Sequence, residues 1–218
     1  PQHIKQGKIT LDLLNVLGIP YEVISNDPVA SRKSLQNAVR SMQERQAPFA
    51  LVIRKGSFES YTLQHKALEL ALELSREQAI ALVADHLDAQ DVVVTTTGMT
   101  SRELFEYREA HNKDHRHDFL TVGSMGHASQ IALGIALSKP ERSVYCIDGD
   151  GALIMHGGSL AILGTQAPQN FKHIVINNGA HDSVGGQPTA GFSINIPAWA
   201  QSCGYHVVLT AQNAPAVK

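Results

Sequence analysis

Length, composition and charge limit the class of protein before any motif is considered. The chain has 218 residues, of which 43% are hydrophobic and 17% charged, so it has enough apolar side chain for a folded core. Lys and Arg number 18 against 20 Asp and Glu, which argues against a nucleic-acid partner. No apolar run is long enough to span a membrane. Two cysteines, Cys146 and Cys203, cannot build a disulfide framework and favour a reducing, cytoplasmic compartment.

The first 60 residues alternate helical and extended patterns. Leucines at helical spacing predict a helix that Gly18 ends, and Asn26-Asp27-Pro28 predicts the start of a second helix. The apolar run over 49–53 is typical of a buried parallel strand. The expected helix, strand, helix and strand lie at 9–17, 21–24, 28–45 and 49–53. We expect a linker at 61–74, although residues 64–74 also have helical composition.

From residue 75 onward, strands and helices alternate regularly. Ser75 and Gln78 form a capping-box pattern that predicts a helix to about residue 87. The predicted strands are 91–97, 118–122, 143–147, 173–176 and 205–210. The helices expected between them are 100–110, one that ends before Pro140, and one that ends near 163. This alternation predicts an α/β, doubly wound parallel sheet, in which ligands bind at the carboxyl ends of the strands.

A glycine-rich acidic turn is the sharpest chemical signal. Gly149-Asp150-Gly151 stands between a predicted strand and a predicted helix, where backbone amides attract phosphate. Because a carboxylate repels a bare phosphate, the pattern favours a divalent cation between the two. Mg²⁺ takes oxygen ligands, and Asn177-Asn178 offers amide oxygens at the end of the next strand. For Gly-Asp-Gly alone, a turn without function would be the better interpretation. Together with the paired asparagines, a metal site is the better one.

These two motifs, 25 residues apart, resemble the signature of thiamine-diphosphate-dependent enzymes. The resemblance implies that Asp150, Asn178 and the backbone carbonyl of Ala180 bind Mg²⁺, which holds the diphosphate. It also implies that Met125 supports the bent cofactor and counts among the catalytic residues. The remaining cofactor contacts implied by the resemblance lie in the turns after three strands: Thr97, Gly98, Thr100, Ser101, Gly123, Ser124, Gly149, Gly151 and Ala152.

Within this family, the segments 118–129 and 177–189 resemble decarboxylases of phosphonopyruvate, with those of sulfopyruvate as the nearest alternative. The resemblance implies decarboxylation of a 2-oxo acid in a homodimer or larger homo-oligomer with sites between subunits. It makes residues 1–60 the end of a pyrimidine-binding domain and 75–218 a diphosphate-binding domain, truncated at its C-terminus.

The cofactor-activating glutamate of the family is expected upstream of Pro1. The isolated 218-residue chain is therefore expected to be inactive, and a non-catalytic cofactor-binding module is the alternative from a different functional class.

Several other polar residues are weaker candidates for chemistry. His181 and Asp182 follow the paired asparagines and are candidates to face substrate. His3 resembles an active-site loop position of related decarboxylases, and His127 follows the Met125 turn. For each histidine, a loop position without function is the stronger interpretation. Three further histidines admit a metal cluster, but their polar setting favours a solvated loop: His111, His115 and His117.

Overall fold

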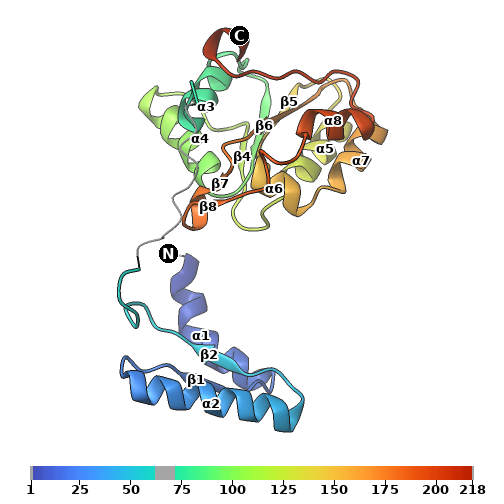
Figure 1. Cartoon of the computed structure of the whole chain (residues 1–218). Coiled ribbons are helices and arrows are strands. Elements are labelled where there is room, and N and C mark those ends of the chain that lie inside the picture. The colour runs from blue at the N-terminus through green and yellow to red at the C-terminus, as the bar shows by residue number, and fades with distance from the viewer. Residues whose placement is uncertain (1, 62–71, 218) are drawn as a thin grey trace. The chain divides into compact units, whose positions relative to one another are not determined.

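The structure is a computed structural model that describes residues 2–61 and 72–217. The chain divides into two compact units, Pro1–Gln64 and His65–Lys218 (Figure 1). The linker expected at 61–74 and the helical composition of 64–74 fall mainly on residues 62–71, which lie outside the described part.

The first unit has the four elements that the sequence predicts. They are α1 (Gln2–Val16), β1 (Tyr21–Val23), α2 (Pro28–Arg45) and β2 (Ala50–Val52). The Asp27 side chain accepts hydrogen bonds from the amides of Val29 and Ala30 and so caps α2. Strands β1 and β2 pair in parallel, but β2 is half-buried rather than buried as predicted, because its sheet has only these two described strands.

The second unit contains a four-stranded parallel sheet in the order β4-β3-β5-β6. Its strands are β3 (Val92–Thr95), β4 (Asp118–Leu120), β5 (Val144–Gly149) and β6 (Phe171–Ile176). The chain adds β4 on one side of β3 and then crosses to place β5 and β6 on the other. This reversal confirms the doubly wound sheet, and it puts the ligand-binding crevice at the carboxyl ends of β3 and β5.

Helices cover both sides of this sheet (Figure 1). The helices of this unit are α3 (Arg76–Asp85), α4 (Met99–Ala110), α5 (Ala128–Ser138), α6 (Asp150–Met155), α7 (Ser159–Gln166), α8 (Ile196–Ser202) and α9 (Ala214–Val217). Helix α8 packs against α7, and α9 packs against α3. Ile80 of α3 and Leu104 of α4 pack on one side, with Val93 and Ile147. The alanines of α5 pack on the other side, with Val94, Val144 and Cys146. Among the described helices, none combines the length and hydropathy needed to cross a bilayer.

Two predictions for the second unit are wrong. The single helix expected to run to residue 163 is two helices, α6 and α7, separated by His156, Gly157 and Gly158. The strand expected at 205–210 is irregular. Two of its apolar side chains are exposed, Val207 at 75% and Leu209 at 88%, whereas Tyr205 and Val208 are half-buried. An extended apolar run forms a strand only where a neighbouring strand supplies hydrogen bonds, and this segment pairs with none of the described strands.

Gly134 in the interior of α5 offers a stability test. A side chain at this exposed position would meet no atom within 4 Å, and glycine destabilises a helix interior relative to alanine. We expect Gly134→Ala to raise the free energy of unfolding by about 0.5–1 kcal/mol. Urea denaturation followed by circular dichroism measures this, and a loss of stability would contradict the open surroundings of Gly134.

Candidate functional site

The predicted acidic turn lies at the carboxyl end of β5. The strand ends at Gly149, which is the N-cap of α6, and Asp150 is the first residue of that helix. The Asp150 side chain is buried, at 2% exposure, and its Oδ2 accepts a hydrogen bond from the Thr189 hydroxyl. A carboxylate is therefore held at a helix N-terminus, where the helix dipole favours negative charge.

Asn177, which follows β6, lies against the same spot. Its Nδ2 donates to the carbonyl of Gly191 at 2.8 Å, and its Oδ1 accepts from the amide of Gly179 at 3.2 Å. A Cβ on Gly191 would overlap Asp150 Oδ2 and lie 2.5 Å from Asn177 Oδ1. The side-chain oxygens of Asp150 and Asn177 thus both lie against Gly191, so the ends of β5 and β6 bring two oxygen atoms to one place.

Asn178, the asparagine expected to bind metal, is engaged within its own loop. Its Nδ2 donates to Asp182 Oδ2 at 2.8 Å, and its Oδ1 accepts from the amide of Ala180 at 3.2 Å. The hydrogen bonds therefore place Asn177, rather than Asn178, beside the Gly191 backbone that contacts Asp150. The assignment of Asn178 and Ala180 as metal ligands stays a prediction.

The turn after β3 contacts two other parts of the predicted site. Gly98 has φ +102°, and a Cβ there would overlap Ser183 Oγ and lie 3.9 Å from Met125 Cε. The amide of Met99, the first residue of α4, donates to Ser183 Oγ at 3.2 Å. The Thr97 hydroxyl accepts from the amide of Gly123 at 3.0 Å. The turns after β3 and β4 are thus joined to each other and to the loop that contains Ser183.

The buried hydroxyl groups near this turn differ in their bonding. Ser101 Oγ lies 2.7 Å from Thr95 Oγ1 and donates to the carbonyl of Thr96 at 2.8 Å. This hydroxyl stabilises the end of β3, and the cofactor contact expected of Ser101 stays a prediction. Thr100 is also buried, at 5% exposure. Thr96 Oγ1 is buried without a hydrogen-bond partner among the described residues.

The turn after β4 has the unusual backbone that its glycines indicate. Gly123, Ser124 and Gly126 all have positive φ, at 77°, 48° and 89°, a region that residues with side chains rarely adopt. Met125 in the middle of this turn is half-buried. A Cβ on Gly126 would lie 2.7 Å from the carbonyl oxygen of Ala152 in α6. The predicted Met125 turn therefore packs directly against the helix that Asp150 begins.

His181 lies over the acidic turn, on a short hairpin formed by β7 (Ala180–His181) and β8 (Gln187–Pro188). A Cβ on Gly151 would lie 2.6 Å from His181 Cε1 and 2.7 Å from Nδ1. The imidazole therefore packs on the backbone of Gly151. Of the candidate histidines, His181 is the one that the described contacts bring to the predicted cofactor turn.

Asp182 takes part in an ion-pair network, and its expected position facing a substrate stays a prediction. It begins a 3-10 turn, Asp182–Val184, and its Oδ2 lies 2.5 Å from Arg76 Nη1. Arg76 also binds Glu103 through two hydrogen bonds, at 2.8 and 2.7 Å. Glu103, and then Asp182, hold the pKa of the Arg76 guanidinium above its usual range. Arg76 thereby links α3 and α4 to the loop after Asn178.

The other histidines have local roles in the structure. His3 lies within α1 rather than in a loop, so its expected loop position is wrong. The His127 ring packs against that of His156 in a tilted arrangement, with centroids 4.2 Å apart and an interplanar angle of 55°. Among the loop histidines, His115 Nε2 lies 2.8 Å from Glu109 Oε1, and its ring stacks on Phe105 with centroids 4.7 Å apart.

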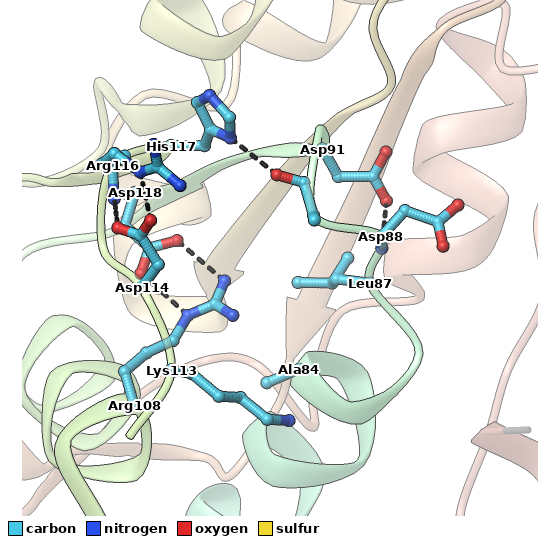
Figure 2. A pocket seen from close by; sticks show the side chains of 11 residues that line it. Ala84, Leu87, Asp88, Asp91, Arg108, Lys113, Asp114, Arg116, His117 and Asp118 are labelled. Atoms are coloured by element: carbon cyan, nitrogen blue, oxygen red, sulfur yellow. Dashed lines mark hydrogen bonds and ion pairs between the residues drawn. The ribbon is translucent and has the colours of Figure 1, made fainter. Parts of the chain in front are cut away.

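A separate cavity of about 250 Å³ lies at the amino ends of β3 and β4 (Figure 2). Its charged side chains largely bind one another. Arg108 forms two hydrogen bonds with Asp118, both 2.9 Å long, and Arg116 pairs with Asp114. His117 Nδ1 lies 2.8 Å from the carbonyl oxygen of Ala89. The cavity is at the opposite edge of the sheet from Asp150, so it is not the predicted cofactor site.

The residues at the carboxyl edge fit a magnesium-bound diphosphate. Asp150 presents a carboxylate oxygen, and the loop after β6 contains the amide oxygens of Asn177 and Asn178. Oxygen atoms of this kind are the ligands that Mg²⁺ takes. Thr96 Oγ1 is buried and unpartnered among the described residues. The backbone at Gly98, Gly151 and Gly191 has no room for a side chain, because Ser183, His181 and Asp150 pack on it.

Comparisons with known proteins agree with this geometry. A family model described as thiamine pyrophosphate enzyme, C-terminal TPP binding domain, matches residues 96–217. The chain is 33% identical, over 95% of its length, to phosphonopyruvate decarboxylase of Streptomyces viridochromogenes, of which it covers 54%. It is 35% identical, over 62% of its length, to sulfopyruvate decarboxylase subunit beta of Methanocaldococcus jannaschii, of which it covers 69%.

A solved structure supports the fold. The crystal structure of benzoylformate decarboxylase from Polynucleobacter necessarius has a TM-score of 0.53 at 16% identity, and the match covers 91% of this chain and 40% of that one.

The fold and the family model together define a thiamine-pyrophosphate-binding domain of the α/β class. The chain belongs to the thiamine pyrophosphate (thiamine diphosphate) enzyme family, and the resemblance found in its motifs is confirmed. It spans about half the length of the phosphonopyruvate decarboxylases that it matches.

Proposed function

We propose that the protein is a decarboxylase that converts phosphonopyruvate to phosphonoacetaldehyde and carbon dioxide with thiamine diphosphate and Mg²⁺. One observation carries the choice of substrate. The similarity to phosphonopyruvate decarboxylase extends over 95% of the chain and thus through both units, whereas the similarity to sulfopyruvate decarboxylase subunit beta covers 62%. On this proposal, residues 1–60 are the end of a pyrimidine-binding domain and 75–218 the diphosphate-binding domain.

The metal in this proposal is held at the acidic turn. Asp150 supplies a buried carboxylate oxygen, and the loop after β6 supplies the amide oxygen of Asn178 and the carbonyl of Ala180. Asn177 holds the Gly191 backbone against Asp150 through its bond to the Gly191 carbonyl. Breaking the bond between Asn178 and Asp182 would free the asparagine side chain to turn toward a cation.

The turns after β3 and β4 would contact the cofactor itself. Thiamine diphosphate, when bound, supplies the nucleophilic carbon and the electron sink that loss of carbon dioxide from a 2-oxo acid requires. Main-chain groups of Gly98, Gly123 and Gly151 would approach the diphosphate, and Met125 would lie beneath the ring, since methionine adapts to irregular gaps. His181, packed on Gly151, is placed to hold or deliver a proton through its imidazole.

Two further properties complete the proposal. The substrate is a small 2-oxo acid, and the protein assembles as a homodimer or larger homo-oligomer in the cytoplasm. Decarboxylation of sulfopyruvate is the second candidate function, because the chain is 35% identical to the M. jannaschii subunit beta and covers 69% of it. The third is a module that binds the cofactor without catalysis.

The test is a comparison of substrates with the full-length protein. Carbon dioxide release is measured with phosphonopyruvate and with sulfopyruvate, each in the presence of thiamine diphosphate and Mg²⁺. We expect kcat/KM to be at least about tenfold higher for phosphonopyruvate, which corresponds to about 1.4 kcal/mol. Faster turnover of sulfopyruvate would establish the second candidate, and cofactor binding without release from either acid would establish the third.

Met125→Ala tests the role of the turn after β4. The variant keeps the predicted metal and diphosphate contacts and removes only the side chain that approaches Gly98. We expect turnover at saturating cofactor to fall about tenfold or more, with less than a threefold change in cofactor affinity, as for an interaction that matters in the transition state. Steady-state kinetics and calorimetric titration measure the two effects. Weakened binding with normal turnover would show that Met125 only packs the turn.

A further inference from the structure

A buried network of polar side chains lies directly beneath the acidic turn. His173 of β6 and Asp148 of β5 have side chains exposed to 2% and 0%, with Nε2 of the histidine 3.5 Å from Oδ2 of the carboxylate. The other histidine nitrogen, Nδ1, lies 2.9 Å from the Tyr205 hydroxyl. The other carboxylate oxygen, Oδ1, accepts a hydrogen bond from the amide of Gly149 at 2.9 Å. Tyr205, His173, Asp148 and Gly149 thus form one sequence of contacts.

The register of the sheet explains why these groups meet. Cys146 and His173 are direct partners on the parallel strands β5 and β6. Asp148 is two residues beyond Cys146, so its side chain points to the same side of the sheet. That side is the one on which α5 packs, because Cys146 belongs to the core cluster with the alanines of α5. Tyr205 reaches the cluster from the irregular segment after α8.

Within this hydrogen-bonded network, two atoms have no hydrogen-bond partner among the described residues, and these two atoms lie next to each other. They are Asp148 Oδ2 and His173 Nε2. A buried carboxylate oxygen without a donor costs several kcal/mol. A movement of about half an ångström would bring the two atoms within ordinary hydrogen-bonding distance. Each atom therefore supplies what the other lacks.

We propose that Tyr205 and His173 are positioning residues that hold Asp148, and through it the Gly149 backbone, so that Asp150 is fixed for binding Mg²⁺. The Tyr205 hydroxyl donates to His173 Nδ1, which leaves the ring proton on Nε2 to be donated to Asp148 Oδ2. Asp148 Oδ1 in turn accepts from Gly149, the residue immediately before Asp150. This inference deepens the proposed function and rests on it.

Two observations support this direction of donation. Burial raises the pKa of the Tyr205 hydroxyl, so the hydroxyl keeps its proton and can donate it. In a neutral histidine one ring nitrogen accepts and the other donates, so if Nδ1 accepts from Tyr205, Nε2 carries the proton and donates. Outer partners of metal ligands are ordered in this way in many metal sites, where their loss weakens metal binding about 10–100-fold.

A metal held by the cluster itself is the competing explanation. Cys146, Asp148 and His173 offer ligand atoms that all lie within 4.8 Å of one another. The burial of Cys146, and next the negative charge of Asp148, raise the pKa of its thiol well above the usual value. A structural zinc site is closed by four ligands, whereas this cluster offers three, so the hydrogen-bonded network is the better account.

The test uses Mg²⁺ titrations of the full-length protein at saturating thiamine diphosphate, followed by calorimetry. Tyr205→Phe removes only the hydroxyl, and His173→Leu removes the donor to Asp148. We expect each to weaken apparent Mg²⁺ affinity about tenfold, at the lower end of the range for outer partners. His173→Gln places an amide N–H near the position of Nε2 and is expected to restore most of the affinity.

Cys146→Ala is the matched control, because it changes a buried side chain on the same side of the sheet that makes none of these hydrogen bonds. It is expected to lower the thermal unfolding temperature but to leave Mg²⁺ affinity unchanged. Equal Mg²⁺ affinity in all variants would overturn the positioning role while leaving the proposed function intact.

Two outcomes separate the remaining explanations. If thiamine diphosphate binds the unaltered full-length protein equally well without Mg²⁺, the proposed function fails at its metal site, and the positioning role fails with it. If elemental analysis found one tightly bound zinc per polypeptide, and Cys146→Ala lost it, the cluster would be a metal site and the hydrogen-bonded network would be overturned.

Discussion

Replacing Asp150 with alanine is expected to abolish Mg²⁺-dependent binding of thiamine diphosphate in the full-length protein. Asp150 is the buried carboxylate at the start of α6, and its loss leaves the metal without an anionic ligand and the diphosphate without a counter-charge. Because even outer partners of a ligand contribute about 10–100-fold to metal affinity, removal of the ligand itself should cost at least about 100-fold. Calorimetric titration with and without Mg²⁺ measures the loss.

Asp114→Ala is the matched control for this substitution. Asp114 is an exposed aspartate at the opposite edge of the sheet, beside the cavity shown in Figure 2, where it pairs with Arg116. The control should bind cofactor as tightly as the unaltered protein, with the same dependence on Mg²⁺. If Asp150→Ala retained that dependence as well, the metal would have to be bound elsewhere.

Much of the second unit could be predicted because local signals and the overall fold agree there. The capping box at Ser75 starts α3 as expected, and the apolar runs before residues 97 and 149 form buried central strands. The segment 205–210 has an equally apolar composition but is irregular. Its conformation depends on whether a neighbouring strand is available for pairing, which periodicity within the segment does not encode.

The site was only partly predictable from the sequence. The two motifs located the turns after β5 and β6, because strand ends gather at one edge of a parallel sheet. The groups that bind those turns come from distant or irregular segments: Arg76, Thr189 and Gly191. A side chain such as Asn178, which has several possible partners in its own loop, takes its orientation from contacts that spacing along the chain does not specify.

Gly191 is a residue of the candidate site that the sequence motifs did not indicate. Although Gly191→Ala adds only one methyl group, we expect it to lower both cofactor affinity and stability strongly. The added Cβ would overlap Asp150 Oδ2 and come within 2.5 Å of Asn177 Oδ1. It would also disturb the backbone that binds Thr189 Oγ1 and the Asn177 amide. We expect Mg²⁺-dependent cofactor affinity to fall at least about tenfold, since ligand positions are displaced, and stability to fall by about 1–3 kcal/mol from overpacking.

Gly134→Ala is the control that separates these two effects, because it makes the same chemical change where a Cβ meets nothing within 4 Å. It should raise stability slightly and leave the Mg²⁺ titration unaltered. Thr189→Val provides a second variant without overpacking, since it removes only the hydroxyl that donates to Asp150. We expect it to stay folded and to weaken Mg²⁺ binding in the same direction as Gly191→Ala. Normal Mg²⁺ affinity in both folded variants would mean that the backbone around Gly191 does not shape the metal site, and that Asp150 is oriented by the strand β5 alone.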